Sequence, residues 1–188
     1  MTTGARRSEL CALRWSALDL DAAVLTLRSA LYVDDAGMVR EQDTKTHQQR
    51  RVALDAETVE VLRDHLERCQ ARAPALGLFM LAQGYVFSPN ADGSMPLVPD
   101  TATQRFGRMA ARLNVETKLR ALRHYSATEL IAAGVDVHTV AGRLGQGGGG
   151  ATTLRVYAAS LSESDQRAAS TLAARMPPHP APRSPLRS

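Results

Sequence analysis

The chain has 188 residues, of which 44% are hydrophobic, so it is long enough to bury the core of one globular domain. No apolar run approaches the length of a membrane span and no basic-then-apolar signal opens the chain, so we expect a cytoplasmic protein. The net charge of +4 is compatible with a polyanionic partner without requiring one. Cys11 and Cys69 fall at apolar helical positions, which favours buried thiols over a disulfide, and no Cys/His spacing indicates a metal site.

The first predicted helix begins close to the N-terminus. Its broad apolar face is formed by six residues: Leu10, Cys11, Leu13, Trp15, Ala17 and Leu18. Two arginines, Arg6 and Arg7, precede that face. Because they differ by one helical step, their side chains should point in different directions.

The periodicity changes to that of strands between residues 24 and 54. Residues 24–27, 30–33 and 51–54 are predicted strands, and residues 34–37 a turn. The loop before the last strand contains Lys45, one of only two lysines in a chain whose other basic residues are arginines. An ammonium group on a flexible stem can give up a proton to a leaving oxygen, which a guanidinium does not readily do.

Two further helices are predicted in the middle of the chain. Asp55 can cap the first, and its apolar face contains Val59, Leu62, Leu66 and Cys69. His65 falls on the polar side and is expected at the surface. Residues 85–88 are predicted as a short strand or an extended segment. Residues 101–113 form the second helix. Its basic residues either contact a DNA backbone or form a solvated face, and they are Arg105, Arg108 and Arg112.

An amphipathic helical pair is predicted between residues 119 and 145. The first helix ends at Gly134, which suits a left-handed C-cap, and the second is capped by Asp136 and closed by Gly145. Their apolar sides contain Leu122, Leu130 and Ile131 in the first helix and Val137, Val140 and Leu144 in the second.

A glycine run and a tyrosine follow this helical pair. The four glycines at 147–150 lose too much backbone entropy to lie inside a helix or strand, so they predict a hinge. A short helix, capped by Thr152 or Thr153, then presents Tyr157. A pair of arginines, a hinge and a downstream tyrosine make chemical sense together if the target is a phosphate.

The order of these motifs resembles the C-terminal catalytic domain of the tyrosine recombinases, the phage integrase family. The matching motifs are Thr-Gly-x-Arg-x-x-Glu-Leu and Leu-x-Trp within 3–15, Thr-Lys-Thr at 44–46, Arg-x-x-Arg-His at 120–124, Leu-Gly at 144–145 and the tyrosine at 157. The resemblance implies an α+β, mainly helical fold with a small antiparallel β-sheet. It further implies that residues 1–176 form the catalytic domain. The five prolines in residues 177–188 predict a disordered tail after that domain.

In the family a DNA-clamping domain precedes this catalytic core. Only two residues, Met1 and Thr2, precede the first motif here. Three interpretations stay open: a mis-assigned coding start, a fragment of a longer protein, or a truncated gene. In each we expect this chain to lack the clamping domain and to bind DNA more weakly.

The resemblance also implies roles for single residues. Arg6 and Arg123 match the arginines that clamp the phosphate, Glu9 the acidic residue that supports them, Lys45 the lysine that protonates the leaving oxygen, and Tyr157 the nucleophile that forms a 3′-phosphotyrosine. Paired guanidiniums suit the pentacoordinate state because each can donate two hydrogen bonds to phosphate oxygens. No metal or other cofactor is implied, because the arginines neutralise the charge and no water has to be activated.

The chain departs from the family pattern at two positions. Arg120 and Gln146 stand where the family has histidines, and neither side chain exchanges a proton near neutral pH. His124 lies about 100° around the helix from Arg123, which disfavours it as a substitute. We therefore expect slower chemistry than in a relative with the full motif.

Three functional hypotheses remain open. The first is a site-specific recombinase or integrase that acts on double-stranded DNA at the nucleoid, with self-association on DNA and accessory DNA-bending proteins as partners. The second is a catalytically weakened or inactive DNA-binding remnant of an integrase. The third is a basic helical scaffold without a role on DNA, which loss of salt-dependent DNA binding would support.

Overall fold

The structure, a computed structural model, describes residues 2–43, 49–146 and 170. Lys45, the hinge at 147–150, Tyr157 and the tail at 177–188 therefore lie outside the described residues. In the described part, no helix is long and apolar enough to cross a membrane.

Short elements make up the N-terminal part of the chain. They are α1 (Arg7–Cys11), η1 (Trp15–Ala17), β1 (Leu18–Asp19), β2 (Val24–Leu27), β3 (Ser29–Val33), β4 (Val39–Asp43) and β5 (Arg50–Ala53). The strands form two antiparallel sheets, one with the order β1-β2-β5 and one that is the β3–β4 hairpin. The expected small antiparallel sheet is confirmed, but as two separate sheets.

Strand β4 was not predicted from the sequence. Its five residues, Val39–Asp43, contain one apolar side chain, so the alternation that marks a half-buried strand is missing. The strand exists because its backbone pairs with β3 from Val33↔Val39 to Ser29↔Asp43. Glu41 ties the hairpin to the body of the protein, since it accepts hydrogen bonds from Arg14 at 2.8 Å and from the hydroxyl of Tyr85 at 2.9 Å.

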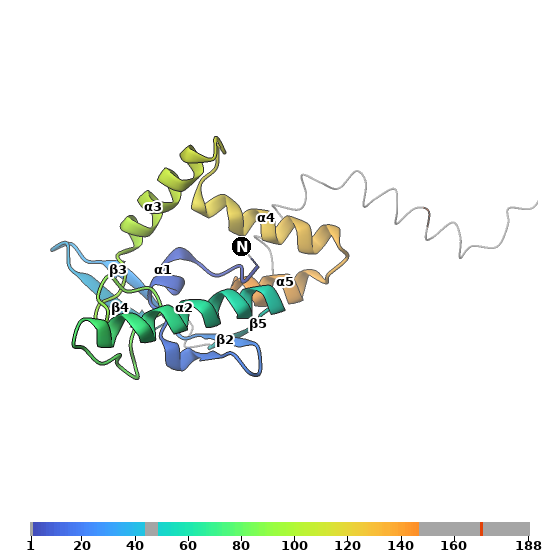
Figure 1. Cartoon of the computed structure of the whole chain (residues 1–188). Coiled ribbons are helices and arrows are strands. Elements are labelled where there is room, and N and C mark those ends of the chain that lie inside the picture. Colours follow the sequence, from blue (N-terminus) through green and yellow to red (C-terminus); the bar gives the residue numbers. More distant parts are fainter. Residues whose placement is uncertain (1, 44–48, 147–169, 171–188) are drawn as a thin grey trace, which may run out of the picture.

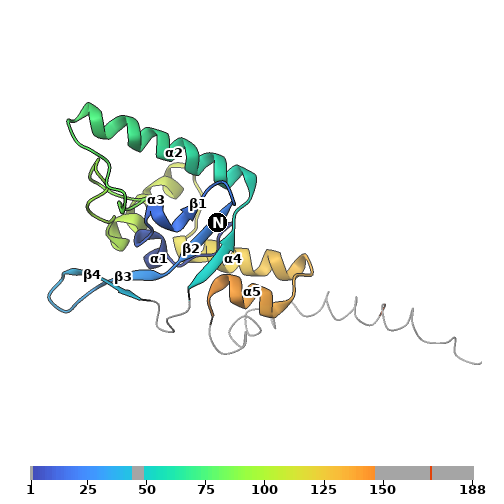
Figure 2. The ribbon, with the colours of Figure 1, turned by 90° about the horizontal axis from the view of Figure 1, so that it is seen from below.

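Helix α2 (Ala56–Ala75) covers the three-stranded sheet, and Figure 2 shows it running along one side of the molecule. Asp55 accepts a hydrogen bond from the backbone N–H of Thr58 at 2.8 Å, which confirms the predicted cap. Val59 and Leu62 of α2 pack against the main core. The buried residues of that core are Leu13, Leu25, Leu27, Val52, Leu54 and Val86.

The prediction that His65 lies at the surface is wrong. Its ring is packed between Trp15 and Phe87, with centroid distances of 5.5 and 5.8 Å, and its Nε2–H donates to the carbonyl oxygen of Val86 at 2.8 Å. The segment around Val86 folds over this side of α2, and helical periodicity alone does not reveal such a partner. The segment at 85–88, predicted as a short strand or an extended segment, contains no full strand, and Tyr85 forms an isolated bridge with Arg14.

Three helices form the rest of the described chain: α3 (Pro99–Arg112), α4 (Leu119–Ala132) and α5 (Val137–Leu144). Asp136 accepts from the backbone N–H of Thr139 at 2.8 Å, and Gly134 and Gly145 both have positive φ, so the predicted helix ends are confirmed. A second core joins α4 to α5 through Ala127, Ile131, Val140 and Leu144. Figure 1 shows this pair on the side of the molecule opposite the β3–β4 hairpin.

Candidate active site

The site begins at the N-terminus of α1, where Arg6 and Glu9 are one helical turn apart. The carboxylate of Glu9 accepts from the backbone N–H of Arg6 and from its Nη1, both at 2.7 Å. Glu9 is 2% exposed, whereas the Arg6 side chain is 46% exposed. A buried carboxylate therefore holds the backbone and one terminal nitrogen of an arginine whose side chain is still partly exposed.

A second arginine, Arg50 at the start of β5, completes the shell of Glu9. Its Nη2 donates to Oε2 at 2.8 Å and its Nη1 to Oε1 at 3.4 Å. Burial raises the pKa of Glu9, but the hydrogen bonds from Arg50 and Arg6 and the charge of Arg50 outweigh burial and hold that pKa below its ordinary value. Glu9 is therefore ionised at neutral pH.

Arg123 enters the site from α4 and is half-buried. Its Nη1 donates to the carbonyl oxygen of Gly4 and its Nη2 to that of Leu144 at 2.5 Å. Burial and then the positive charge of Arg6 lower the pKa of Arg123 to about 10, while Glu9 opposes the shift. Arg123 thus remains protonated at neutral pH, and the repulsion by Arg6 shows that the two guanidiniums share one environment.

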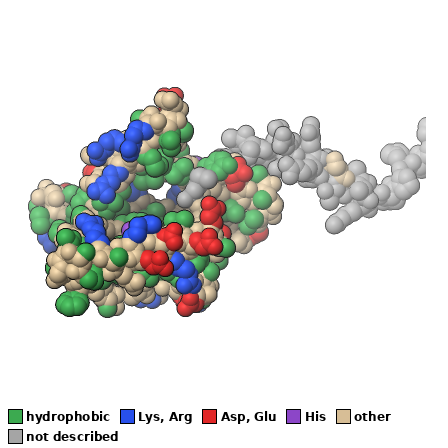
Figure 3. Space-filling model, in the orientation of Figure 1, with side chains coloured by type: hydrophobic (Ala, Val, Ile, Leu, Met, Phe, Trp, Pro, Cys, Tyr) green, Lys and Arg blue, Asp and Glu red, His purple; other side chains and the backbone are tan. Residues whose placement is uncertain are grey.

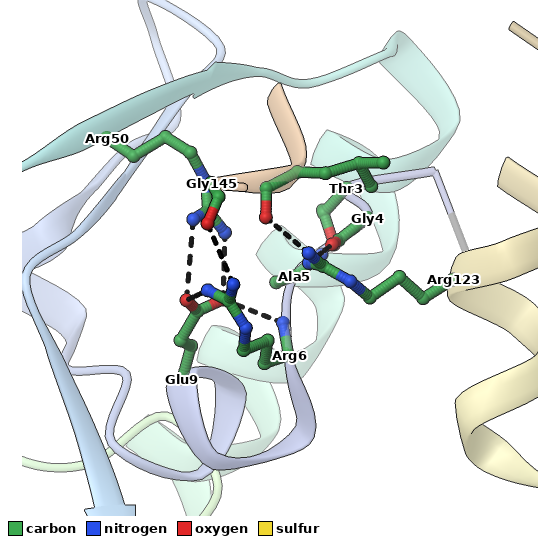
Figure 4. Close-up of polar contacts among 9 residues, drawn as sticks. Thr3, Gly4, Ala5, Arg6, Glu9, Arg50, Arg123 and Gly145 are labelled. Atoms are coloured by element: carbon green, nitrogen blue, oxygen red, sulfur yellow. Dashed lines mark hydrogen bonds and ion pairs between the residues drawn. The ribbon is translucent and has the colours of Figure 1, made fainter. Parts of the chain in front are cut away.

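The C-terminus of α5 binds both Arg6 and Arg123. Gly145 ends the helix in the left-handed region at φ +61° and its carbonyl oxygen accepts from Arg6 Nη2 at 2.7 Å, next to the Leu144 carbonyl that accepts from Arg123. Carbonyl groups at a helix C-terminus lack helical partners and favour cations. Figure 4 shows how α1, β5, α4 and the end of α5 converge on this cluster.

A cavity of about 870 Å³ opens between α1, α3 and α4, and Figure 3 shows the hollow beneath α3 and α4. The predicted phosphate-clamping arginines, Arg6 and Arg123, both line it, as do the two altered positions, Arg120 and Gln146. His124 also lines the cavity. The remaining lining residues include Lys118, Leu10, Phe106, Leu119 and Leu122.

Arg7 has a different task from Arg6, as their spacing predicted. Its Nη1 donates to Thr103 at 2.7 Å and to Asp100 at 3.1 Å. These contacts tie α1 to α3 and so shape the wall of the cavity.

The sequence interpretation missed Arg50, which is part of the site. Nothing in the local sequence distinguishes Arg50 from Arg51 as a charged group. The alternation of β5 does, because Arg50 and the buried Val52 are two residues apart and therefore share the inward face.

Several solved structures resemble the chain. The Tn1549 transposon integrase in complex with circular intermediate DNA matches with a TM-score of 0.73 and 22% identity, over 91% of this chain and 56% of that one. XerA recombinase matches with a TM-score of 0.62 and 22% identity, over 95% and 56%. XerH recombinase in a post-cleavage complex with its difH substrate matches with a TM-score of 0.56 and 20% identity, over 82% and 38%.

The chain therefore spans little more than half the length of the first two structures. At these identities the likeness shows a shared fold. No curated protein matches the chain significantly. Residues 1–163, however, match the sequence profile of the phage integrase family, and the chain belongs to that family.

Proposed function

We propose that the protein is the catalytic part of a site-specific DNA recombinase, which integrates or exchanges DNA through a 3′-phosphotyrosine intermediate. The observation that carries the proposal is the convergence of Arg6 and Arg123 on one open cavity, beside the buried Glu9. A phosphodiester in this cavity would meet two guanidiniums, each suited to paired hydrogen bonds with phosphate oxygens. Family membership and the DNA complexes of the transposon integrase and XerH support the same chemistry.

In the proposed reaction the hydroxyl oxygen of Tyr157 attacks the scissile phosphorus. The new P–O bond forms as the bond to the 5′ oxygen breaks, the phenolic proton passes to water, and Lys45 gives a proton to the leaving oxygen. Arg6 and Arg123 bind the non-bridging oxygens, on which negative charge rises in the pentacoordinate state. Attack by a 5′-hydroxyl of another strand reverses these steps and releases the tyrosine.

Two side chains on the cavity wall favour a second candidate function, a catalytically weakened or inactive DNA-binding protein. Arg120 adds positive charge and Gln146 can donate a hydrogen bond to a phosphate oxygen, but neither moves a proton at neutral pH. Charge stabilisation by Arg6 and Arg123 is retained in this candidate, while proton transfer is slowed. Binding of DNA is common to both functions, so covalent chemistry separates them.

The proposed partner is double-stranded DNA, bound by a catalytic domain that comprises residues 1–176. Exposed arginines on α3 support this, because Arg105, Arg108 and Arg112 recur at helical spacing and Figure 3 shows basic side chains along that helix. We include in the proposal self-association on DNA, accessory DNA-bending proteins and a location on the nucleoid in the cytoplasm.

A covalent-trapping assay tests the proposed function. Nicked duplexes from the DNA that flanks the gene are incubated with the full chain, and a protein–DNA adduct that survives denaturation is sought. We expect an adduct with the native chain and none with Tyr157→Phe. Tyr125→Phe is a matched control, because Tyr125 is an exposed tyrosine of α4 outside the cavity lining, and it should form the adduct as the native chain does.

A third variant, Gln146→His, distinguishes the two candidate functions. An adduct that forms with Gln146→His but not with the native chain would overturn the recombinase and establish the weakened remnant. An adduct that persists in Tyr157→Phe would contradict the assigned nucleophile.

A further inference from the structure

Arg50 belongs to the arginine cluster but does not face the cavity. In the described part of the chain the cavity is lined by Arg6 and Arg123, and neither Glu9 nor Arg50 contributes to it. The Arg50 side chain is 11% exposed, and both of its terminal nitrogens donate to Glu9. A phosphate in the cavity would therefore not touch Arg50, and any effect of this residue acts through Glu9 and Arg6.

The Arg50 guanidinium is held tightly between Glu9 and the backbone of Gly145. A Cβ atom on Gly145 would lie 1.7 Å from Nη1 and 2.7 Å from Cζ of Arg50, so a side chain and this guanidinium exclude each other. The Nε of Arg50 is buried without a hydrogen-bond partner in the described residues. A buried donor without a partner is unfavourable. Arg50 therefore places its positive charge beside Glu9 although its Nε loses a hydrogen bond.

The charges of the cluster show what Arg50 contributes. Arg6, Arg50 and Arg123 carry three positive charges and Glu9 carries one negative charge, which leaves two positive charges in excess. Without Arg50, the carboxylate of Glu9 would cancel much of the charge of Arg6, the only other guanidinium with which it forms an ion pair among the described residues. A phosphate in the cavity would then meet a weaker positive field, and the field matters most when charge builds on its oxygens.

We propose that Arg50 is a positioning residue that neutralises the buried Glu9, so that Arg6 and Arg123 keep two positive charges for a phosphate. This role rests on the proposed function for its meaning in DNA cleavage. The effect of Arg50 on the binding of a tetrahedral oxyanion does not depend on any reaction and can be measured directly.

The charge balance is tested by titrating the full chain with inorganic sulfate and measuring the binding by calorimetry or NMR. We expect Arg50→Gln to bind sulfate about tenfold more weakly than the native chain, because one positive charge is lost in a partly buried site. Arg50→Lys keeps the positive charge but lacks the paired N–H donors of a guanidinium, so its affinity for sulfate should fall about threefold. Arg51→Gln removes the exposed neighbouring arginine of the same strand and should change the affinity less than twofold.

Two further comparisons separate charge from simple packing. The double variant Glu9→Gln/Arg50→Gln has the same net charge as the native cluster, so it should bind sulfate more tightly than Arg50→Gln alone. In Arg50→Gln the affinity should also recover as the pH falls, because Glu9 loses the partner that most lowers its pKa and protonates more easily. Neither recovery is expected if Arg50 only fills space.

The outcomes are separable from the proposed function. Sulfate affinity of Arg50→Gln equal to that of the native chain, or equal losses in Arg50→Gln and Arg50→Lys, would overturn the charge role whether or not the native chain forms a DNA adduct. If thermal unfolding shows that Arg50→Gln does not fold, the double variant Glu9→Gln/Arg50→Gln is used instead, because it removes the buried charge as well. The sulfate affinity of the double variant should stay within about threefold of the native value. A larger loss in that variant would contradict charge neutralisation.

Discussion

Glu9 is the residue on which the stability of the arginine cluster depends. It is buried, it is ionised, and its two oxygens accept from the backbone and side chain of Arg6 and from the side chain of Arg50. Removing one partner of such a buried pair leaves the other charge uncompensated, and this is more costly than replacing both partners together. The cluster therefore behaves as a unit.

Glu9→Gln should lower the free energy of unfolding at pH 7 by about 3 kcal/mol, the usual effect of breaking a buried ion pair. The pKa of Glu9 in the folded state lies below its ordinary value of 4.5, so its contribution is complete above that value and is lost as the pH falls through the folded pKa. The difference between native and variant should shrink below pH 4.5. Urea unfolding across the acid range measures it.

Glu60→Gln is the control for this experiment, because Glu60 is exposed on α2. We expect Glu60→Gln to follow the native pH dependence throughout. Parallel native and Glu9→Gln curves down to about pH 3 would contradict a lowered pKa at Glu9.

Single residues also show where sequence interpretation reaches its limit. Arg6 and Arg123 were identified from motif order, and the structure brings both to one cavity. Arg50 and His65 were missed because their partners, Glu9 and Val86, are distant in sequence. The alternation of β5 points Arg50 inward, but it does not reveal Glu9 as the partner. Helical or strand periodicity predicts which way a side chain points, but not what it meets.

Among the elements, the end of α5 links the cluster to the fold. Its last carbonyl groups, those of Leu144 and Gly145, accept from Arg123 and Arg6. The left-handed Gly145 leaves room for the guanidinium of Arg50. One helix end therefore orients the two arginines that line the cavity and accommodates the third.

Gly145→Ala should be more destabilising than the same change at another helix end. Alanine in the left-handed region costs about 1 kcal/mol at either position. At Gly145 the added Cβ would also lie 1.7 Å from Arg50 Nη1, so the ion pair with Glu9 must rearrange. We expect a total loss of about 3 kcal/mol in urea unfolding, together with weaker sulfate binding.

Gly134→Ala is the matched control, because Gly134 also ends a helix at positive φ and has no atom within 4 Å of an added Cβ. This variant should show the backbone cost alone. If Gly145→Ala and Gly134→Ala lower the free energy of unfolding equally, the guanidinium of Arg50 does not need the space beside Gly145.

Element boundaries were predictable where a single residue carries the signal. The caps at Asp55 and Asp136 and the left-handed ends at Gly134 and Gly145 follow from local chemistry, and the structure confirms them. Strand β4 was not predictable, because its polar sequence joins the sheet through backbone pairing with β3. The helix predicted to include the apolar residues from Leu10 to Leu18 was also wrong at its end, because α1 stops at Cys11. The sequence therefore predicts a helix end only where a capping residue or a glycine marks it.

At the scale of the whole molecule, basic groups lie on both the wall and the rim of the cavity. Arg6, Arg120 and Arg123 line it, while α3, which borders it, carries an exposed arginine row. Helix α2 is also rich in arginine but contributes no residue to the described lining. This asymmetry allows the proposed phosphate contacts of α3 to be tested separately from general basic charge.

Arg105→Gln/Arg108→Gln should weaken binding to duplex DNA and reduce its dependence on salt. Each phosphate contact adds about 0.9 to the slope of log K against log salt concentration, so the loss of two contacts should lower the slope by about 2. Arg68→Gln/Arg72→Gln removes the same charge from exposed positions of α2 and should leave the slope nearly unchanged. Fluorescence anisotropy over a series of salt concentrations measures both. Equal slopes for the two double variants would make the α3 row a solvated face, and a native chain without salt-dependent binding would favour a scaffold that does not act on DNA.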